Sequence, residues 1–164
     1  MAQTIAICPG SFDPITIGHL DIISRTAKMF DKVIVVVMDN VQKKNKTSFT
    51  SEERRELISR CVTEFPNVEV DNYSGLLAEY AKQKGAVAIV KGLRAVSDYE
   101  YEFQQALINK KLNPDVDTIF MSASTDNMFL SSSIVKHVSA LGGDVNAFLP
   151  EPIREDVLKR IQAG

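Results

Sequence analysis

Short β-branched, apolar segments alternate with helix-like segments along the whole of this 164-residue chain. The clearest one, VIVVVM at residues 33–38, is apolar on both faces, which is typical of a strand in the middle of a parallel sheet covered on both sides. Strands that alternate with helices favour right-handed βαβ crossovers. The sequence therefore predicts an α/β fold, a Rossmann-like doubly wound sheet of five parallel strands, in a single domain at residues 1–164.

Turn and cap residues divide the chain into its predicted elements. The strands are expected at residues 4–8, 33–38, 68–70, 86–90 and 118–121. The helices are expected at about 18–30, 50–65, 76–84, 98–112, 132–141 and 153–161, and a Thr50–Glu53 capping box opens the second of them. In a parallel sheet the ligand binds beyond the carboxyl ends of the strands. The loops after the first, second, fourth and fifth strands, the first of which begins at Pro9, are therefore the expected site.

The bulk composition argues against several classes of function. A formal net charge of -2 and a pI of about 5.7 disfavour nucleic acid as a partner, because binding to its phosphate backbone usually needs a basic surface. The apolar runs are far too short to span a bilayer, so no membrane association is expected. Two cysteines without a C-x-x-C pattern suggest a reducing compartment, and we expect a cytoplasmic protein. Two histidines are too few for a histidine-rich metal site, and no metal-binding residues are predicted.

The loop after the first strand carries the string PGSFDPITIGH at residues 9–19. Glycine lets a ligand approach the backbone closely, and a helix that begins at Gly18 presents free N–H groups and a partial positive charge, which suit phosphate. His19 would project from the first helical turn toward that ligand. In the plainer interpretation Thr16 is an N-cap and His19 an ordinary helix residue, and the residues by themselves leave both interpretations open.

Other loops at the same predicted edge carry cations and hydroxyl groups. Lys43, Lys44 and Lys46 follow the second strand, the string KGLR at 91–94 follows the fourth, and three serines at 131–133 precede the fifth helix. An anionic substrate would need such groups. However, a lysine cluster is more often a solvated surface, and serines before a helix often serve only as its cap.

These strings resemble, in the same order, the motifs of the pantetheine-phosphate adenylyltransferases, a family of the nucleotidylyltransferase superfamily. KGLRAVSDYEYE at 91–102 is similar to the family's R-G-[LI]-R-x-x-x-D-[FY]-E-Y-E, and residues 9–19 resemble its first motif. The resemblance runs from residue 4 to about residue 150. It implies a nucleotidylyltransferase-type fold and an enzyme of coenzyme A biosynthesis, which transfers the adenylyl group of ATP to 4'-phosphopantetheine and gives dephospho-coenzyme A and pyrophosphate.

The resemblance also implies roles for individual residues. His19 would be the catalytic residue and would stabilise the transition state. The residues expected to bind phosphopantetheine are Ser11, Lys43, Leu77 and Lys91. The residues expected to bind ATP are Ser11, Phe12, His19, Gly92, Leu93, Arg94, Glu102, Asn127, Met128, Phe129, Leu130, Ser131, Ser132 and Ser133.

Three places depart from the family pattern. The lysine loop looks longer, so Lys44 or Lys46 could take the place of Lys43 as the substrate lysine. Lys91 stands where the family usually has arginine, and it keeps the charge but loses the bidentate fork. We therefore expect weaker or re-angled binding of the substrate phosphate. Asn127 stands where relatives often carry an aromatic residue.

The implied chemistry needs mainly positioning and electrostatics. The nucleophile is a phosphate whose second pKa is about 6, so it is largely anionic at pH 7 and can attack in line without a general base or a covalent intermediate. The triphosphate implies Mg²⁺, for which the sequence has no dedicated carboxylate cage. The resemblance further implies a homohexamer, and it raises coenzyme A as a feedback ligand.

Three other classes of function compete with this interpretation. A nucleotidylyltransferase acting on glycerol phosphate or nicotinate mononucleotide is disfavoured by the string at 91–102. A nucleotide-binding regulator without catalysis is disfavoured by His19, although Lys91 and Asn127 keep it open. A dinucleotide-dependent oxidoreductase is set aside, because no G-x-G-x-x-G follows the first strand.

Overall fold

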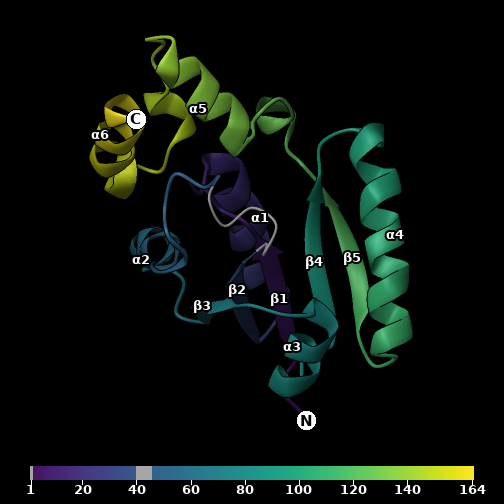
Figure 1. Cartoon of the computed structure of the whole chain (residues 1–164). Coiled ribbons are helices and arrows are strands. Elements are labelled where there is room, and N and C mark those ends of the chain that lie inside the picture. Colours follow the sequence, from purple (N-terminus) through teal and green to yellow (C-terminus); the bar gives the residue numbers. More distant parts are fainter. Residues whose placement is uncertain (1, 40–45) are drawn as a thin grey trace.

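The computed structural model describes residues 2–39 and 46–164, and its centre is a sheet of five parallel strands (Figure 1). The strand order is β3-β2-β1-β4-β5. The strands are β1 (Ile5–Gly10), β2 (Lys32–Met38), β3 (Val68–Tyr73), β4 (Ala88–Leu93) and β5 (Asp117–Ser122). The predicted α/β class, the parallel sheet and the position of every strand are confirmed.

Helices cover both faces of the sheet, as a doubly wound fold requires. They are α1 (Ile17–Ala27), α2 (Ser51–Cys61), α3 (Leu77–Lys84), α4 (Val96–Leu112), α5 (Ser132–Ala140) and α6 (Arg154–Ala163). All six were predicted within a few residues. Three short 3₁₀ turns, at Thr125–Asn127, Asn146–Phe148 and Glu151–Ile153, were not.

Two apolar clusters lie on opposite faces of the sheet, because alternate side chains of a strand point to opposite sides. Val33 and Val35 belong to the larger cluster, which also holds buried residues of α1, α2, α5 and α6. Ile34 and Val36 belong to the smaller cluster, where they pack with Tyr80 of α3. The strand that reads as apolar on both faces is thus covered on both faces.

The first, third and fourth strands run further than the sequence suggested, and β3 ends at Tyr73 instead of residue 70. Pro9 was expected to begin a loop, but β1 continues to Gly10 and pairs with β2 throughout. The carbonyl of Ile5 accepts a bond from Val87 near the start of β4, and since alternate residues share a direction, the nitrogen of Pro9 faces the same side. On that side β1 and β4 pair only at Ala6 and Ile7, so the missing N–H of Pro9 breaks no ladder bond.

The fourth strand was expected to end at residue 90, with Lys91 and Gly92 in the loop that follows. Instead β4 includes both residues and ends at Leu93, because its pairing with β5 continues to Ser122. Past Ile7, β1 and β4 are no longer paired with each other. A crevice can therefore open between these two central strands at their carboxyl ends.

The carboxyl-terminal helix α6 is fastened to the start of α2. Arg160 donates two hydrogen bonds to the Glu53 carboxylate, at 2.7 and 3.0 Å, and its guanidinium lies 4.9 Å from the centre of the Phe49 ring. Figure 1 shows α5 and α6 together at the end of the molecule above α1 and α2. Among the described residues, no helix combines the length and the apolarity needed to cross a membrane.

The predicted capping box at the start of α2 is present. The Thr50 hydroxyl accepts from the Glu53 N–H at 3.2 Å, and the Glu53 carboxylate accepts from the Thr50 N–H at 2.8 Å. Because Thr50→Ala leaves the Glu53 N–H without its acceptor, we expect the free energy of unfolding to fall by about 1 kcal/mol, measured by urea unfolding. Thr50→Ser is the matched control and should keep most of the stability. Equal stabilities of the alanine variant and the unmodified chain would contradict the role of the cap.

Candidate active site

Two cavities open beside the carboxyl ends of β1 and β4. The first has a volume of about 520 Å³ and lies between the loop after β1, the start of α1, the end of β4 and the start of α5. The second, of about 730 Å³, lies between β1, the start of α3 and the inner side of α4. Both cavities are lined by Pro9, Gly10, Ser11, Lys91 and Glu102. They therefore meet at a shared wall, where two ligands could contact each other.

The first cavity brings together most of the residues predicted to bind ATP. Those that line it are Ser11, Phe12, His19, Gly92, Arg94, Glu102, Asn127, Leu130, Ser131, Ser132 and Ser133. Leu93, Met128 and Phe129 do not line it. The exposed Phe129 ring instead packs edge-on against Phe148 at 5.5 Å between centroids.

The second cavity brings together Ser11, Leu77 and Lys91 of the residues predicted to bind phosphopantetheine. Lys43, the predicted substrate lysine, and its alternative Lys44 lie outside the described residues. The other alternative, Lys46, is described and lines neither cavity.

Sequence reasoning missed the side of α4 that faces the second cavity. Tyr101, Gln105 and Asn109 line it, together with Met38 and Asp39 at the end of β2. Positions four apart on a helix share a face, so this spacing was a readable signal. It could not be weighted, because nothing in the sequence says that this side of the helix faces a cavity rather than a packed core.

His19 belongs to the capped first turn of α1, and it also lines the first cavity. It is the third residue of α1, and the N-cap Thr16 donates its backbone N–H to Nδ1 of His19 at 3.0 Å. Because Nδ1 accepts this bond, the proton of a neutral ring is on Nε2. Burial, followed by the positive charges of Arg94 and Lys91, lowers the pKa of His19 to about 4. The cavity therefore holds a neutral imidazole that can donate one hydrogen bond from Nε2.

Phe12 adopts a backbone conformation that L-residues avoid. Its φ is 48°, in the left-handed region, which costs an L-residue on the order of 1 kcal/mol. The buried ring packs edge-on against His19, with 5.1 Å between the centroids. A Cβ at Gly10 would lie 3.0 Å from the same ring, so this position favours glycine. The strained turn thus places an aromatic ring between the end of β1 and the histidine.

Two cations stand at the end of β4, each with one carboxylate partner. The ammonium group of Lys91 lies 3.4 Å from the Glu102 carboxylate, in the wall shared by the two cavities. Arg94 lies 3.3 Å from the Asp98 carboxylate and donates from Nη1 to the Leu130 carbonyl at 3.2 Å. Arg94 therefore ties the end of β4 to the segment that precedes α5.

Two of the three serines have structural partners. Ser131 is the N-cap of α5, its hydroxyl accepting from the Ile134 N–H at 3.2 Å, and Ser132 donates its hydroxyl to the Pro14 carbonyl at 2.7 Å. The cap expected as the plainer interpretation is therefore present. The N-terminus of α5 still faces the first cavity and favours an anion there. In the described part of the chain, no three His, Cys, Asp or Glu side chains cluster so as to hold a metal ion.

Comparisons with known proteins agree with this geometry. The family model described as cytidylyltransferase-like matches residues 7–138. The phosphopantetheine adenylyltransferase of Clostridium kluyveri is 56% identical over 155 residues, which are 94% of this chain and 93% of that protein. The phosphopantetheine adenylyltransferase of Clostridium tetani is 53% identical over 158 residues, which are 96% of this chain and 98% of that protein.

Solved structures show that the fold is shared more widely. A putative nicotinate-nucleotide adenylyltransferase from Vibrio parahaemolyticus superposes with a TM-score of 0.69 at 16% identity, over 97% of this chain and 96% of that one. A bifunctional NMN adenylyltransferase/ADP ribose pyrophosphatase from Francisella tularensis, complexed with AMP and a manganese ion, gives a TM-score of 0.67 at 16% identity, over 99% of this chain and 50% of that one. Because it is 53% and 56% identical to the two clostridial proteins over nearly their full length, the chain belongs to the phosphopantetheine adenylyltransferase family, within the cytidylyltransferase-like proteins.

Proposed function

We propose that this chain transfers the adenylyl group of ATP to 4'-phosphopantetheine, giving dephospho-coenzyme A and pyrophosphate. The observation that carries the proposal is the wall shared by the two cavities, with a neutral histidine and a helix N-terminus on one side and an amide- and leucine-lined space on the other. ATP would occupy the first cavity and phosphopantetheine the second. The family of the relatives specifies this pair of substrates.

The second cavity suits a pantetheine arm by its chemistry. Such an arm has two amide groups and an apolar dimethyl carbon. The cavity offers the side-chain amides of Gln105 and Asn109, and apolar surface from Leu76, Leu77 and Ile108. A second nucleotide would favour aromatic side chains on which its base could stack. The amides and leucines of this cavity instead favour phosphopantetheine as the acceptor.

The reaction is a direct displacement at the α-phosphorus. An oxygen of the acceptor phosphate forms a bond to the α-phosphorus, the bond to the bridging oxygen of the β-phosphate breaks, and pyrophosphate leaves with that electron pair. No proton has to be removed from a nucleophile that is already anionic. His19 would donate from Nε2 to an α-phosphate oxygen, where negative charge develops, and the N–H groups of the first turn of α1 would assist it.

The cations would offset the repulsion between the two anionic substrates. Lys91, in the shared wall, would meet the acceptor phosphate. Arg94 and the N-terminus of α5 would meet the β- and γ-phosphates. The roles of Lys43 or its neighbours stay a prediction, because Lys43 and Lys44 lie outside the described residues.

The substrate nucleotide is proposed to be ATP with Mg²⁺ already bound. Phosphate oxygens and water would hold the ion, since Mg²⁺ is usually bound through substrate phosphates and keeps several waters. Coenzyme A is proposed as a feedback ligand, since it carries both a pantetheine arm and an adenine nucleotide and so matches the two joined cavities. A cytoplasmic location accords with two free, buried cysteines, Cys8 and Cys61.

Pyrophosphate release from ATP, Mg²⁺ and 4'-phosphopantetheine tests the proposed reaction. Release should need all three components. Because His19→Ala removes a donor that acts on developing charge, kcat should fall on the order of a hundred- to a thousandfold. His137→Ala, which changes the chain's other histidine outside both cavities, is the matched control and should keep its activity. No release by the folded protein, or release only with another phosphate acceptor, would overturn the proposed substrate.

The low pKa of His19 makes the stability of the folded chain depend on pH. The folded pKa of about 4 lies below the ordinary 6.5, so between these values the unfolded chain binds one more proton than the folded chain. His19 therefore lowers stability as the pH falls through this window and makes no further difference above it. We expect NMR of the imidazole to show a neutral ring with the proton on Nε2 from pH 8 to 5. His19→Gln should lose less stability than the unmodified chain between pH 6.5 and 4, and an NMR pKa near 6.5 would contradict the assignment.

A homohexamer is proposed from the family resemblance and from the outer surface of α4. None of the residues of this helix is buried, and away from the second cavity it exposes four large apolar side chains: Val96, Tyr99, Phe103 and Leu107. So much exposed apolar surface on one helix is typical of an interface. Size-exclusion chromatography with light scattering should give six times the 18.2 kDa mass of one chain. A monomer at micromolar concentration would contradict the proposal.

A further inference from the structure

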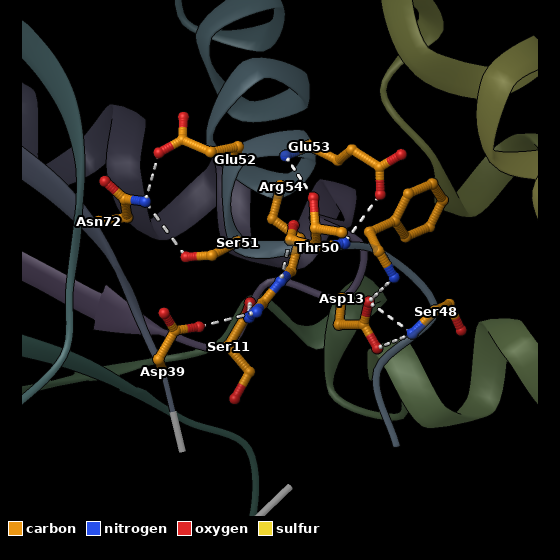
Figure 2. A network of polar contacts seen from close by, with 11 residues as sticks. Ser11, Asp13, Asp39, Ser48, Thr50, Ser51, Glu52, Glu53, Arg54 and Asn72 are labelled. Carbon is orange, nitrogen blue, oxygen red and sulfur yellow. Dashed lines mark hydrogen bonds and ion pairs between the residues drawn. The ribbon is translucent and has the colours of Figure 1, made fainter. Parts of the chain in front are cut away.

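The guanidinium of Arg54 is buried behind the loop that follows β1. The residue is 4% exposed, although it lies on a surface helix, α2. Nη1 donates to the Ser11 carbonyl at 2.8 Å, Nη2 to the Asp39 carboxylate at 3.1 Å and Nε to the Thr50 carbonyl at 3.3 Å (Figure 2). One side chain thus joins the loop after β1, the end of β2 and the start of α2.

The residue whose carbonyl Arg54 holds lies where three cavities converge. Ser11 lines the first and the second cavity, and also a third of about 340 Å³ between the end of β2 and the start of α2. In Figure 2 the Ser11 side chain points away from Arg54. Arg54 therefore fixes the backbone of Ser11 from behind and leaves its hydroxyl free to face ligands.

The same bond sets the conformation of the next residue. The Ser11 carbonyl belongs to the peptide unit between Ser11 and Phe12, so a rotation of this unit changes φ of Phe12. That φ is 48°, and an L-residue released from this value would move toward the ordinary negative region. Since the Phe12 ring packs against His19, such a movement would shift the surface that supports the imidazole.

A second buried charge holds the other end of this loop. Asp13 is 5% exposed and accepts from the backbone N–H groups of Ser48 and Phe49, and from the Lys136 ammonium group at 2.9 Å. Figure 2 shows the carboxylate turned toward Ser48. Asp13 and Arg54 thus hold the loop on either side of Phe12.

We propose that Arg54 is a positioning residue for the transfer reaction, acting on His19 through the Ser11–Phe12 peptide and the Phe12 ring. Three acceptors around one planar group require the fork of arginine, and the single ammonium group of lysine cannot reach all three in the same geometry. The inference rests on the proposed adenylyl transfer for its kinetic consequence only. The predicted change at His19 is a property of the ligand-free protein.

Arg54→Lys tests this role while keeping the charge beside Asp39. We expect kcat for pyrophosphate release to fall about tenfold to a hundredfold, since a small misplacement of catalytic groups has effects of this size. The KM values for ATP and phosphopantetheine should change much less. Arg55→Lys is the matched control, because Arg55 neighbours Arg54 on α2 but is half exposed and paired with Glu52. Its kinetics should equal those of the unmodified chain.

NMR of the ligand-free protein separates positioning from mere stabilisation. Arg54→Lys should shift the ring signals of His19 and Phe12 at a temperature well below unfolding, whereas Arg55→Lys should not. If Arg54→Lys does not fold, Asp39→Asn is the second variant, because it removes the ionic partner of Arg54. It should shift the same His19 signals, although Asp39 lines the second cavity and His19 the first. Unchanged His19 signals and unchanged kcat in a folded Arg54→Lys, or unchanged signals in Asp39→Asn where that variant replaces it, would overturn the proposal. Unmodified protein that releases no pyrophosphate would refute the proposed reaction and leave the NMR result to decide the role of Arg54.

Discussion

The separation of β1 from β4 is the constraint on which the site depends. These central strands pair at Ala6 and Ile7 and then part, while β1 stays paired with β2 and β4 with β5 as far as their ends. The strand order reverses direction at the same place, since the chain winds from β1 toward β3 on one side and from β4 toward β5 on the other. Doubly wound sheets bind ligands at such a switch point. Both cavities and their shared wall follow from it.

Electrostatics in this crevice favour anions without a permanent counter-charge on the histidine. Burial holds the pKa of His19 low, and the positive charges of Arg94 and Lys91 at the end of β4 lower it further. The Thr16 N–H fixes the tautomer that leaves Nε2 as a donor. A neutral donor can strengthen its bond as charge grows on a phosphate oxygen, and it does not need to lose or gain a proton during the reaction. In the proposed reaction, His19 would therefore act by charge stabilisation rather than by acid–base catalysis.

The sequence was sufficient for the layout of the fold and for much of the first cavity. Apolar runs and caps such as Thr50–Glu53 gave every strand and helix, because periodicity and capping are local properties. Strand ends were less predictable, and Pro9 looked like a loop residue because nothing local reveals that its nitrogen faces an unpaired side. In the second cavity, Ser11, Leu77 and Lys91 were predicted, but the α4 wall was missed. Its wall on α4 is defined by what lies opposite Gln105 and Asn109, which is a tertiary property.

Within the segment 127–133, resemblance to the family motif did not decide which residues line the first cavity. Leu130 and the three serines line the first cavity, whereas Met128 and Phe129, from the same motif, do not. A motif fixes the order of residues along the chain. The 3₁₀ turn at Thr125–Asn127 and the contact of Phe129 with Phe148 decide which residues of the motif face the cavity. Neither the turn nor the contact has a clear local signature in the sequence.

The two buried charges near Ser11 are better explained by geometry than by stability. Removing an arginine or a carboxylate from water costs several kcal/mol, and well-packed apolar side chains in the same places are often at least as stabilising. Yet Arg54 and Asp13 are both almost fully buried, and each bonds to two backbone groups near the cavities and to one charged side chain, Asp39 for Arg54 and Lys136 for Asp13. Apolar packing is non-directional and could not hold the Ser11 carbonyl at one angle while Phe12 remains in the left-handed region. Directional, charge-assisted hydrogen bonds can do so, which is why this part of the core is ionic.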